Sequence, residues 1–432
     1  MSDLLLSRVR RAREASRALL ELDTEAKNHA LEAISENLDE ERGAILEANR
    51  QDLQKAEQNG LAPPLLKRLR FDAGKLQDVR YGIAATRGLP DPSGRVIGAR
   101  ELDEGLILKQ VTCPIGVIGM VFESRPDALV QIATLALKSG NAIILKGGSE
   151  AAESNRALAD AIERGAAQAG MPKGWIVLIE TREDVAALLA MDEYIDLLIP
   201  RGSNEFVRQI MNPTTIPVLG HADGICHVYL DESAEPRMAV DVTVDSKTQY
   251  VAVCNAAETL LVHRGVADEL LPKVADALSA KYVRLKGCPQ TKRILPEIEE
   301  AKDEDWSTEY LDHTLAIKIV SGLDEAIDHI NRYGSHHTDA IVTSDPANAD
   351  AFYRRVDSAS VMWNASTRFA DGFRYGLGAE VGISTSKIHA RGPVGLEGLV
   401  TYQWRVAGKG HKVADYAGEH PRAFIHRELP AE

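Results

Sequence analysis

The sequence has few of the residues that build disulfide frameworks and metal sites. Its 432 residues include four cysteines, which are widely spaced, form no C-x-x-C pair and do not cluster with histidine. The zinc-protease motif H-E-x-x-H is missing, and the adjacent His336 and His337 cannot ligate a metal from one helix face. We therefore expect neither disulfides nor a metal ion, and the reduced thiols of a cytoplasmic protein fit this composition best.

Long apolar runs and an excess of basic charge are also missing. No stretch is long and apolar enough to span a membrane, and the charged N-terminus shows no signal-peptide pattern. The 50 basic and 64 acidic residues give a formal net charge of −14, and aromatic residues make up only 5%. Because nucleic-acid binders need basic surfaces interleaved with aromatic residues, we expect no nucleic-acid partner and no membrane partner. A small anionic substrate stays compatible, since a local pocket can be positive on an acidic protein.

Two common catalytic signatures are absent from the chain. There is no G-x-S-x-G elbow, so serine-based hydrolysis has no support. The dinucleotide fingerprint G-x-G-x-x-G is missing as well, and the glycine-rich segment 376–382 has the wrong spacing and follows no apolar strand.

What the chain does contain is a helical start followed by two strand–helix series. Apolar residues recur at helical spacing up to about residue 90, and a Pro- and Gly-containing turn ends this region. A hairpin is expected near 96–112, and short apolar runs then alternate with helical segments, including a strand at 214–220. A second alternating series starts near residue 226. This alternation predicts an α/β protein with parallel sheets and ligands at the strand ends.

Three consecutive strand ends carry polar or small residues in the places where parallel sheets bind ligands. These are residues 123–125, 146–149 and 201–203. They could line one crevice for a nucleotide, because the carboxyl ends of parallel strands meet at one edge of a sheet. They could equally be ordinary loops between strands and helices, and the spacing alone does not decide.

Cys254 is the candidate nucleophile that its position suggests. We expect it at the end of a strand YVAVC, where backbone N–H groups of the following loop could lower its pKa and hold an oxyanion. An isolated cysteine is more often a small buried hydrophobic residue, which is our interpretation of Cys113 and Cys288. Cys226, near the start of another strand, is the second choice.

Seven motifs occur in order over nearly the whole chain. They are PIGVIGMVFESRPD, LALKSGNAIILKGGSEA, IPRGS, VLGHADGICHVYLD, SKTQYVAVCNAAETLLVH, EYLDHTLAIKIV and GLGAEVGISTSKIHARGPVGLEGLVTYQW. Each alone is modest evidence, but in this order they resemble the aldehyde dehydrogenase superfamily. Within it they are most similar to the γ-glutamyl phosphate reductase family of proline biosynthesis. The resemblance makes Cys254, which matches the thiol of that family, the expected catalytic nucleophile.

The resemblance implies two doubly wound parallel-sheet domains and a small β element for oligomerisation. A cofactor-binding domain would cover residues 1–225, and a catalytic domain would cover residues 226–400. The hairpin 96–112 and the C-terminal strand and arm at 401–432 would form the oligomerisation element, so a homo-oligomer is expected.

The same resemblance assigns residues to an NADP(H) site. Lys146 matches the lysine that contacts the adenosine ribose, and Glu309 matches the acid that binds the nicotinamide ribose. Ser203, which follows Gly202, matches the small residue at the helix start beside the pyrophosphate, where free N–H groups bind anions. Ser149 stands where NAD-preferring relatives often have a glutamate. Without that carboxylate the 2′-phosphate is not repelled, so NADP is the expected cofactor.

Two departures from the oxidising relatives bear on the chemistry. Ser124 stands in place of an asparagine that helps to form their oxyanion hole, so the Cys254 backbone N–H and a different donor would stabilise the oxyanion. VLGHADG lacks the glutamate that activates water in hydrolytic relatives and offers only Asp223. The Cys254 thioester would then be exchanged with phosphate and not with water. The implied reaction is the reduction of L-glutamyl 5-phosphate by NADPH to L-glutamate 5-semialdehyde.

An anionic substrate needs cations, and Arg125, Lys247 and Arg368 lie in the matched loops. Salt bridging at the surface or between domains is an equal alternative for each of them. The substrate also implies functional coupling to a glutamate 5-kinase. Two rival functions stay open: a hydrolytic aldehyde dehydrogenase that makes a free acid with NAD, and a non-catalytic binding or structural protein that kept the fold.

Overall fold

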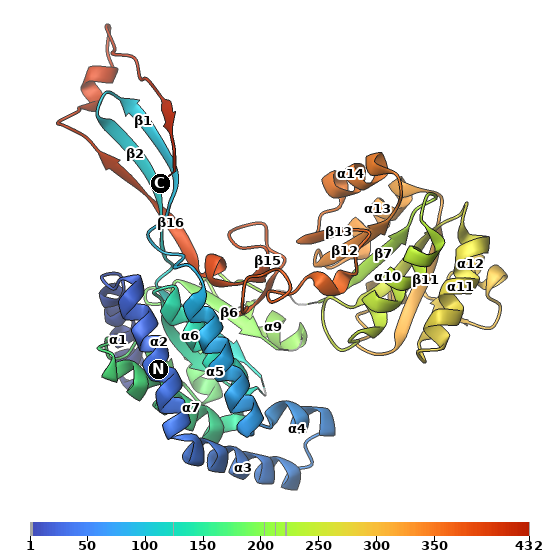
Figure 1. The fold of residues 1–432 in the computed structure, drawn as a ribbon, viewed down its shortest axis with the longest axis horizontal. Coiled ribbons are helices and arrows are strands. Elements are labelled where there is room, and N and C mark those ends of the chain that lie inside the picture. The colour runs from blue at the N-terminus through green and yellow to red at the C-terminus, as the bar shows by residue number, and fades with distance from the viewer. Residues whose placement is uncertain (1–2, 124, 203, 212, 221–222, 432) are drawn as a thin grey trace.

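The computed structural model describes residues 3–123, 125–202, 204–211, 213–220 and 223–431. Two α/β domains lie side by side, and a four-stranded sheet projects from the first of them (Figure 1). The α/β class with two parallel sheets that the sequence predicts is confirmed. Within the described ranges no helix is both long enough and apolar enough to cross a membrane.

The chain begins with five helices, as the spacing of its apolar residues predicts. The side chains of Asp23 and Asp72 cap two of them, accepting hydrogen bonds from the backbone N–H of Ala26 at 2.8 Å and of Lys75 at 3.0 Å. Such caps satisfy first-turn N–H groups that have no partner within the helix. The helices are α1 (Asp3–Leu19), α2 (Thr24–Glu40), α3 (Arg42–Gln58), α4 (Pro63–Leu69) and α5 (Ala73–Gly88).

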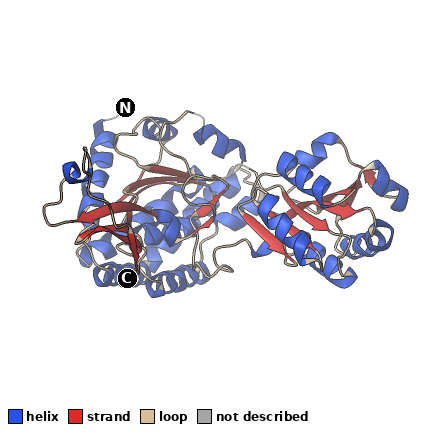
Figure 2. Ribbon diagram, turned by 90° about the horizontal axis from the view of Figure 1, so that it is seen from above, coloured by secondary structure: helices blue, strands red, loops and turns tan. Residues whose placement is uncertain are grey.

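The first sheet has four parallel strands in the order β5-β4-β3-β6. Its strands are β3 (Val117–Phe122), β4 (Ala142–Lys146), β5 (Ile176–Leu178) and β6 (Leu197–Arg201). The helices of this domain are α6 (Pro126–Lys138), the short η1 (Ser149–Ala151), α7 (Ala152–Gln168), α8 (Arg182–Leu188) and α9 (Asn204–Met211). β3 is buried along its whole length, because helices pack on both faces of the sheet (Figure 2). Since β3 lies between β4 and β6, the carboxyl ends of these three strands meet at one edge.

The second sheet has seven parallel strands in the order β10-β9-β11-β8-β7-β12-β13. The strands are β7 (Cys226–Leu230), β8 (Ala257–His263), β9 (Arg284–Gly287), β10 (Glu299–Glu300), β11 (Thr314–Val320), β12 (Thr338–Val342) and β13 (Ser360–Trp363). The helices are α10 (Pro236–Thr248), α11 (Ala267–Ser279), α12 (Pro289–Ile294), α13 (Leu323–Tyr333) and α14 (Pro346–Arg355), with the 3-10 turns η2 (Asp303–Ser307) and η3 (Thr367–Phe369). Val228 and Leu230 of β7 pack with α10 and α11, whereas Tyr229 between them packs with α13 and α14. Successive side chains of a strand point to opposite faces, so this sheet is covered on both sides.

The projecting sheet is antiparallel and joins two distant parts of the chain in the order β16-β2-β1-β17. Its strands are β1 (Val96–Asp103), β2 (Leu106–Pro114), β16 (Val400–Ala407) and β17 (Arg427–Leu429). The hairpin expected near 96–112 is present, and the expected C-terminal strand pairs with it. Tyr402, Trp404 and Val406 on the outer strand β16 are 50%, 59% and 60% exposed.

Two segments outside the turn that carries Cys254 differ from the expectation. Residues 214–220 make only one isolated bridge, between Val218 and Leu198, where a full strand was expected. Val381, Val394 and Leu396 belong to the core of the first domain, although the expected catalytic segment 226–400 includes them. The return of the chain to the first domain explains this placement, because β16 has to reach the hairpin that projects from that domain (Figure 1).

Candidate active site

Cys254 lies in a turn between α10 and β8, close to the junction of the two domains. The prediction that YVAVC forms a strand is wrong, because residues 251–256 are bends and turns and the strand begins only at Ala257. Two hydrogen bonds fix the turn to residues 367–370. Asn255 Nδ2 donates to the Ala370 carbonyl at 2.8 Å, and Thr367 Oγ1 donates to the Asn255 carbonyl at 2.7 Å. Cys254 is therefore a partly exposed thiol in a fixed loop.

Gly224 is packed against the backbone of this turn. A Cβ added at Gly224 would lie 2.2 Å from the Cys254 carbonyl oxygen and 2.3 Å from its Cα. Real Cβ atoms essentially never approach so closely, so only glycine fits at this position without a shift of the loop that carries Cys254.

A histidine contacts the thiol directly. His337 Nε2 lies 3.2 Å from Cys254 Sγ, and His337 Nδ1 lies 2.8 Å from Thr338 Oγ1 at the start of β12. In the sequence, the adjacent residues His336 and His337 show only that this histidine is unsuited to a metal site on one helix face. Its position could have been found only from the strand order, which places β7 beside both β8 and β12.

Cys226, the second choice as nucleophile, lies beneath the turn that carries Cys254 and is hydrogen-bonded to its backbone. Its side chain is fully buried, and its Sγ donates to the Cys254 carbonyl at 3.2 Å. Burial raises the pKa of the Cys226 thiol well above its usual range, with further contributions from Asp339 and Cys254. Cys226 is therefore a packing residue of the site, and Cys254 is the exposed member of the pair.

Charged groups from both domains act on Cys254. Burial raises the pKa of its thiol to about 12, and the carboxylates Glu309 and Glu380 contribute in the same direction. The Arg201 guanidinium and a backbone hydrogen bond act in the opposite direction. The sequence predicts Glu309 near the site and places Arg201 at one of the three strand ends of the expected crevice, but it gives no sign of the charge of Glu380 near the thiol.

Arg201 is a buried cation at the end of β6. Burial lowers the pKa of its guanidinium, and the neighbouring Arg125 acts in the same direction. Its Nη1 is buried without a hydrogen-bond partner among the described residues. A guanidinium nitrogen without a partner in the described part of the chain, whose charge reaches the Cys254 thiol, could bind an oxyanion or phosphate, since buried polar groups are normally hydrogen-bonded.

Two of the three residues expected to bind the substrate carry their charge close to this centre: Arg125 acts on Arg201, and Arg368 interacts with Cys254. Arg125 forms an ion pair with Asp127 at 3.0 Å and keeps 43% of its side chain exposed. Arg368 is buried, and its Nε donates to Gln249 Oε1 at 2.9 Å. Burial lowers the pKa of Arg368, and the charge of Cys254 opposes that change, which places this guanidinium within electrostatic range of the thiol.

Lys247 does not fit its expected role. Its Nζ forms a 2.5 Å ion pair with Glu258 Oε2, and both side chains are 0% exposed. Glu258 Oε1 also accepts a hydrogen bond from the backbone N–H of Leu311 at 3.3 Å. Lys247 faces inward from α10, so its ammonium is neutralised by Glu258 and does not face the site around Cys254. Through the hydrogen bond to Leu311, Glu258 also fixes the loop that carries Glu309.

The expected nucleotide site lies at the edge where β4, β3 and β6 end. Lys146 is half-buried, burial lowers the pKa of its ammonium, and its Nζ donates to the Gly147 carbonyl at 2.7 Å. A Cβ on Gly147 would lie 2.1 Å from Asn155 Nδ2, and Asn155 Oδ1 is buried with no hydrogen-bond partner in the residues that the structure describes. This tight turn and its unsatisfied polar atom fit a polar ligand at the strand ends.

Gly202 and Ser149 lie at the same edge. A Cβ on Gly202 would lie 2.7 Å from the Glu123 carboxyl carbon, so glycine allows the close approach of two strand ends. Ser149 opens η1, and the charge of the next residue, Glu150, favours the protonated form of Lys146. The expected oxyanion residue Ser124 and the expected pyrophosphate residue Ser203 lie outside the described residues.

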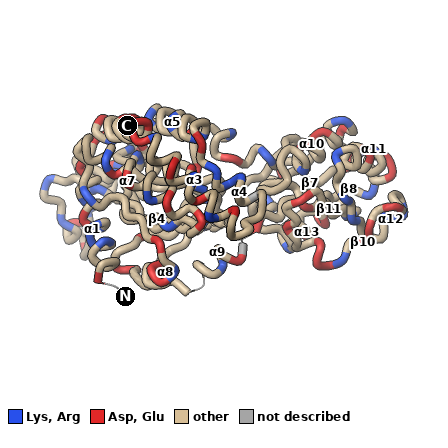
Figure 3. Tube along the Cα trace, turned by 90° about the horizontal axis from the view of Figure 1, so that it is seen from below, with Lys and Arg blue, Asp and Glu red and all other residues tan. Residues whose placement is uncertain are grey.

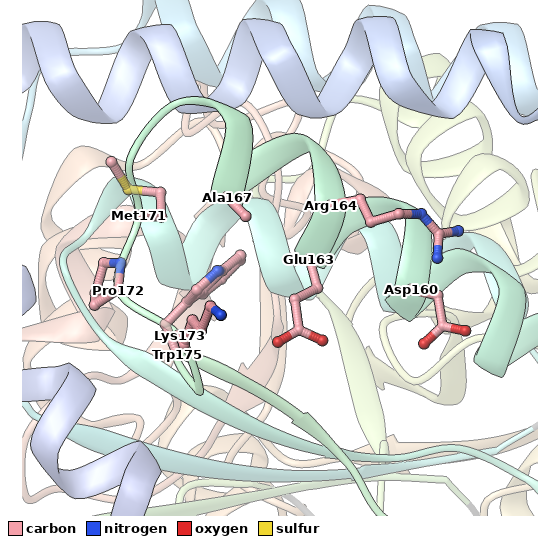
Figure 4. A pocket seen from close by; sticks show the side chains of 8 residues that line it. All are labelled: Asp160, Glu163, Arg164, Ala167, Met171, Pro172, Lys173 and Trp175. Carbon is pink, nitrogen blue, oxygen red and sulfur yellow. The ribbon is translucent and has the colours of Figure 1, made fainter.

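The rest of the described structure offers a surface hollow but no metal site. The described part of the chain contains no group of three His, Cys, Asp or Glu side chains that could hold a metal ion. A hollow of about 290 Å³ is lined by Asp160, Glu163, Arg164, Ala167, Met171, Pro172, Lys173 and Trp175 (Figure 4). The C-terminal half of α7 and the loop to β5 form this hollow. It lies away from the carboxyl ends of β4, β3 and β6, so it does not belong to the site around Cys254. Acidic and basic residues are interspersed over both domains (Figure 3).

Comparison with known proteins places this arrangement in a family. The family model "Aldehyde dehydrogenase family" matches residues 6–302. The chain is 59% identical over 420 residues to a protein of Pelotomaculum thermopropionicum named gamma-glutamyl phosphate reductase, covering 97% of this chain and 96% of that protein. A relative of the same name from Acetivibrio thermocellus is 57% identical and covers 96% of each chain.

Solved structures give the same result. The crystal structure of gamma-glutamyl phosphate reductase from Thermotoga maritima superposes with a TM-score of 0.93 at 42% identity, covering 95% of this chain and 100% of that chain. An acetylating aldehyde dehydrogenase from Geobacillus thermoglucosidasius shares the fold, with a TM-score of 0.66 at 18% identity over 95% of this chain and 97% of that chain. The chain therefore belongs to the aldehyde dehydrogenase family, among the relatives named gamma-glutamyl phosphate reductase.

Proposed function

We propose that this protein reduces L-glutamyl 5-phosphate to L-glutamate 5-semialdehyde with NADPH and releases phosphate, the second step of proline biosynthesis from glutamate. The observation that carries the proposal is the position of Cys254, a thiol fixed in a loop within electrostatic range of the cations Arg201 and Arg368. A nucleophile with cations beside it suits an acyl group whose leaving group is an anion. The names of the relatives support the same substrate.

The mechanism starts with attack of the Cys254 thiolate on the acyl carbon. The bond between that carbon and the phosphate oxygen breaks, and a thioester forms on Cys254. When bound, NADPH would supply a hydride to the thioester carbon. The carbon–sulfur bond then breaks, the sulfur keeps the electron pair, and the aldehyde leaves. The Cys254 backbone N–H stabilises the oxyanion of each tetrahedral stage, and the loss of one such donor typically costs about 10²–10³ in rate.

Phosphate and not water is the proposed acyl partner of the thioester. Hydrolytic enzymes need a carboxylate that activates water, and Asp223, the acidic residue of the loop before β7, instead forms an ion pair with Arg208 of α9. The Arg201 guanidinium, whose Nη1 is buried without a partner among the described residues, would bind the phosphate. Arg125 and Arg368 are the proposed contacts for the carboxylate of the substrate.

NADP is the proposed cofactor. Lys146 would contact the adenosine ribose at the end of β4, and Glu309 would bind the nicotinamide ribose near Cys254. Gly202 and Ser203 precede α9, where free backbone N–H groups suit the pyrophosphate. Ser149 carries no charge that would repel the 2′-phosphate.

A homo-oligomer built on the projecting sheet is proposed as well. The exposed aromatic residues Tyr402 and Trp404 on β16 offer apolar area that a partner would cover. A cytoplasmic enzyme whose substrate is an acyl phosphate would gain from functional coupling to the glutamate 5-kinase that supplies it.

The reaction is tested in reverse with glutamate 5-semialdehyde and NADP. We expect NADP reduction to require added phosphate or arsenate, because the thioester needs that acceptor. Equal rates without either anion would instead identify a hydrolytic aldehyde dehydrogenase and refute the proposal. Cys254→Ser should abolish turnover while NADP still binds, and a variant that kept most of the rate would point to a non-catalytic role for the thiol.

A further inference from the structure

We propose that His337 is the catalytic base that takes the proton from the Cys254 thiol and returns it when the thiolate leaves. The proposal deepens the proposed function, because it rests on Cys254 being the nucleophile. Its basis is a direct contact: Nε2 of the imidazole lies 3.2 Å from Cys254 Sγ, within hydrogen-bond distance for sulfur.

The second nitrogen of the ring sets which proton the imidazole carries. Nδ1 lies 2.8 Å from Thr338 Oγ1, and the Thr338 side chain is fully buried. If the Nδ1 proton is donated to this hydroxyl, the lone pair of Nε2 faces the thiol and accepts its proton. Thr338 begins β12, so the ring is anchored to the rigid sheet and not to a loop.

The surroundings of the thiol explain why a base is required. Burial and the carboxylates Glu309 and Glu380 disfavour the thiolate and raise the pKa of Cys254 to about 12. Arg201 and Arg368 favour the thiolate, but without a proton acceptor a thiol with so high a pKa is almost entirely protonated at neutral pH. Proton transfer to an adjacent imidazole creates a thiolate–imidazolium pair, in which each charge stabilises the other.

The two titratable groups on the far side of the imidazole, Cys226 and Asp339, do not offer an alternative base. Cys226 lies on the Nδ1 side, with its Sγ 3.9 Å from that nitrogen, and its thiol is held protonated by burial. The carboxylate of Asp339, two residues after His337 along the chain, is engaged by His227, whose Nδ1 lies 2.8 Å from Asp339 Oδ1, and by the hydroxyl of Ser358. His337 thus places a titratable nitrogen within hydrogen-bond distance of the sulfur, whereas Glu309 and Glu380 act on the thiol through their charge.

The proton balance of the reaction fits this role. Cys254 S–H loses its proton to His337 Nε2, and the thiolate displaces phosphate from the acyl carbon. After hydride has reached the thioester carbon, the carbon–sulfur bond breaks and the sulfur takes the electron pair. The imidazolium then returns its proton to the thiolate, so the enzyme is unchanged. The released phosphate takes up one proton from water in each turnover.

A substrate-free measurement tests the base directly. Cys254 is alkylated with iodoacetamide between pH 5 and pH 9, and the modified Cys254 peptide is quantified by mass spectrometry. We expect the wild-type rate to reach a plateau below pH 8, because the ion pair supplies thiolate there. His337→Gln keeps a hydrogen-bonding group near the sulfur but cannot accept a proton, and its rate at pH 7 should fall about 10²-fold.

His336→Asn is the matched control. His336 precedes the base in sequence, but its Nδ1 contacts the Asp357 carbonyl at 2.6 Å, and 43% of its side chain is exposed. Its φ of 62° is in the left-handed region, which asparagine tolerates better than most residues. The control should alkylate at the wild-type rate, and NADP binding should be unchanged in both variants.

Several outcomes would overturn the proposal. A His337→Gln variant that alkylates at the wild-type rate, or an equal loss in His336→Asn, would show that the imidazole is not the base. If His337→Gln does not fold, His337→Asn replaces it. The pH profile of wild-type alkylation also tests the ion pair without any variant. A wild-type rate that rises continuously to pH 9 without a plateau rules out the ion pair. Because no substrate is present, these results are independent of the phosphate-dependence test.

Discussion

Gly224→Ala should damage catalysis far more than a single methyl group suggests. The new Cβ would lie 2.2 Å from the Cys254 carbonyl oxygen, and an ordinary contact requires 3.4 Å. One of the two backbones must therefore move by about 1.2 Å, and forced shifts of this kind in a packed interior typically cost about 1–3 kcal/mol. A displacement of a reacting group by about 1 Å can reduce the rate by about 10²-fold.

The assay is the phosphate-dependent reduction of NADP by glutamate 5-semialdehyde, with urea unfolding measured in parallel. We expect kcat to fall about 10²-fold and the free energy of unfolding to fall by about 1–3 kcal/mol. Gly220→Ala is the matched control in the same segment, because a Cβ there meets Pro200 Cγ at an ordinary 3.5 Å. Wild-type kcat and stability in Gly224→Ala would refute the claim that this glycine determines the position of the nucleophile.

Three further predictions address the cofactor, the buried ion pair and the acid stability. Ser149→Glu should weaken NADP binding at least about tenfold relative to NAD, measured as the ratio of the two dissociation constants; an unchanged ratio would contradict the proposed site for the 2′-phosphate. Lys247→Met should lower the free energy of unfolding by about 3–5 kcal/mol because it leaves Glu258 buried without its partner. A loss below about 1 kcal/mol would show that the ion pair contributes little to stability. Burial lowers the pKa of His329 to about 2, below its unfolded value, so its contribution to stability is complete above about pH 6.5 and decreases on acidification, by about 2 kcal/mol at pH 5. Urea unfolding at pH 7 and pH 5 should show this loss in the wild type and not in His329→Gln.

Local patterns predicted the parts of the fold that depend on neighbouring residues. The alternation of apolar runs and helical segments located the strands that end at Lys146 and Arg201, and the hairpin at 96–112 followed from its turn. The motif order predicted the family and, through it, Cys254. These features are encoded over short stretches of chain, where hydrophobic period and turn residues suffice.

The environment of Cys254 could not be predicted in the same way. His337 follows the nucleophile by more than eighty positions, and the contact exists only because β12 and β8 both flank β7 in the sheet. The spacing on α10 likewise does not reveal that Lys247 faces Glu258 and not the substrate. Both contacts depend on the order of strands in space, which a single sequence does not state.

The return of the C-terminal segment to the first domain has a consequence for biosynthesis. The core of that domain includes Val381, Val394, Leu396 and Leu399. These side chains leave the ribosome only after nearly the whole chain has been translated. The second domain, whose strands run without interruption from β7 to β13, has all its strands available earlier. The domain that starts first on the ribosome is thus the one that finishes last, and nascent chains that stop short of β16 would leave its hydrophobic interior incomplete.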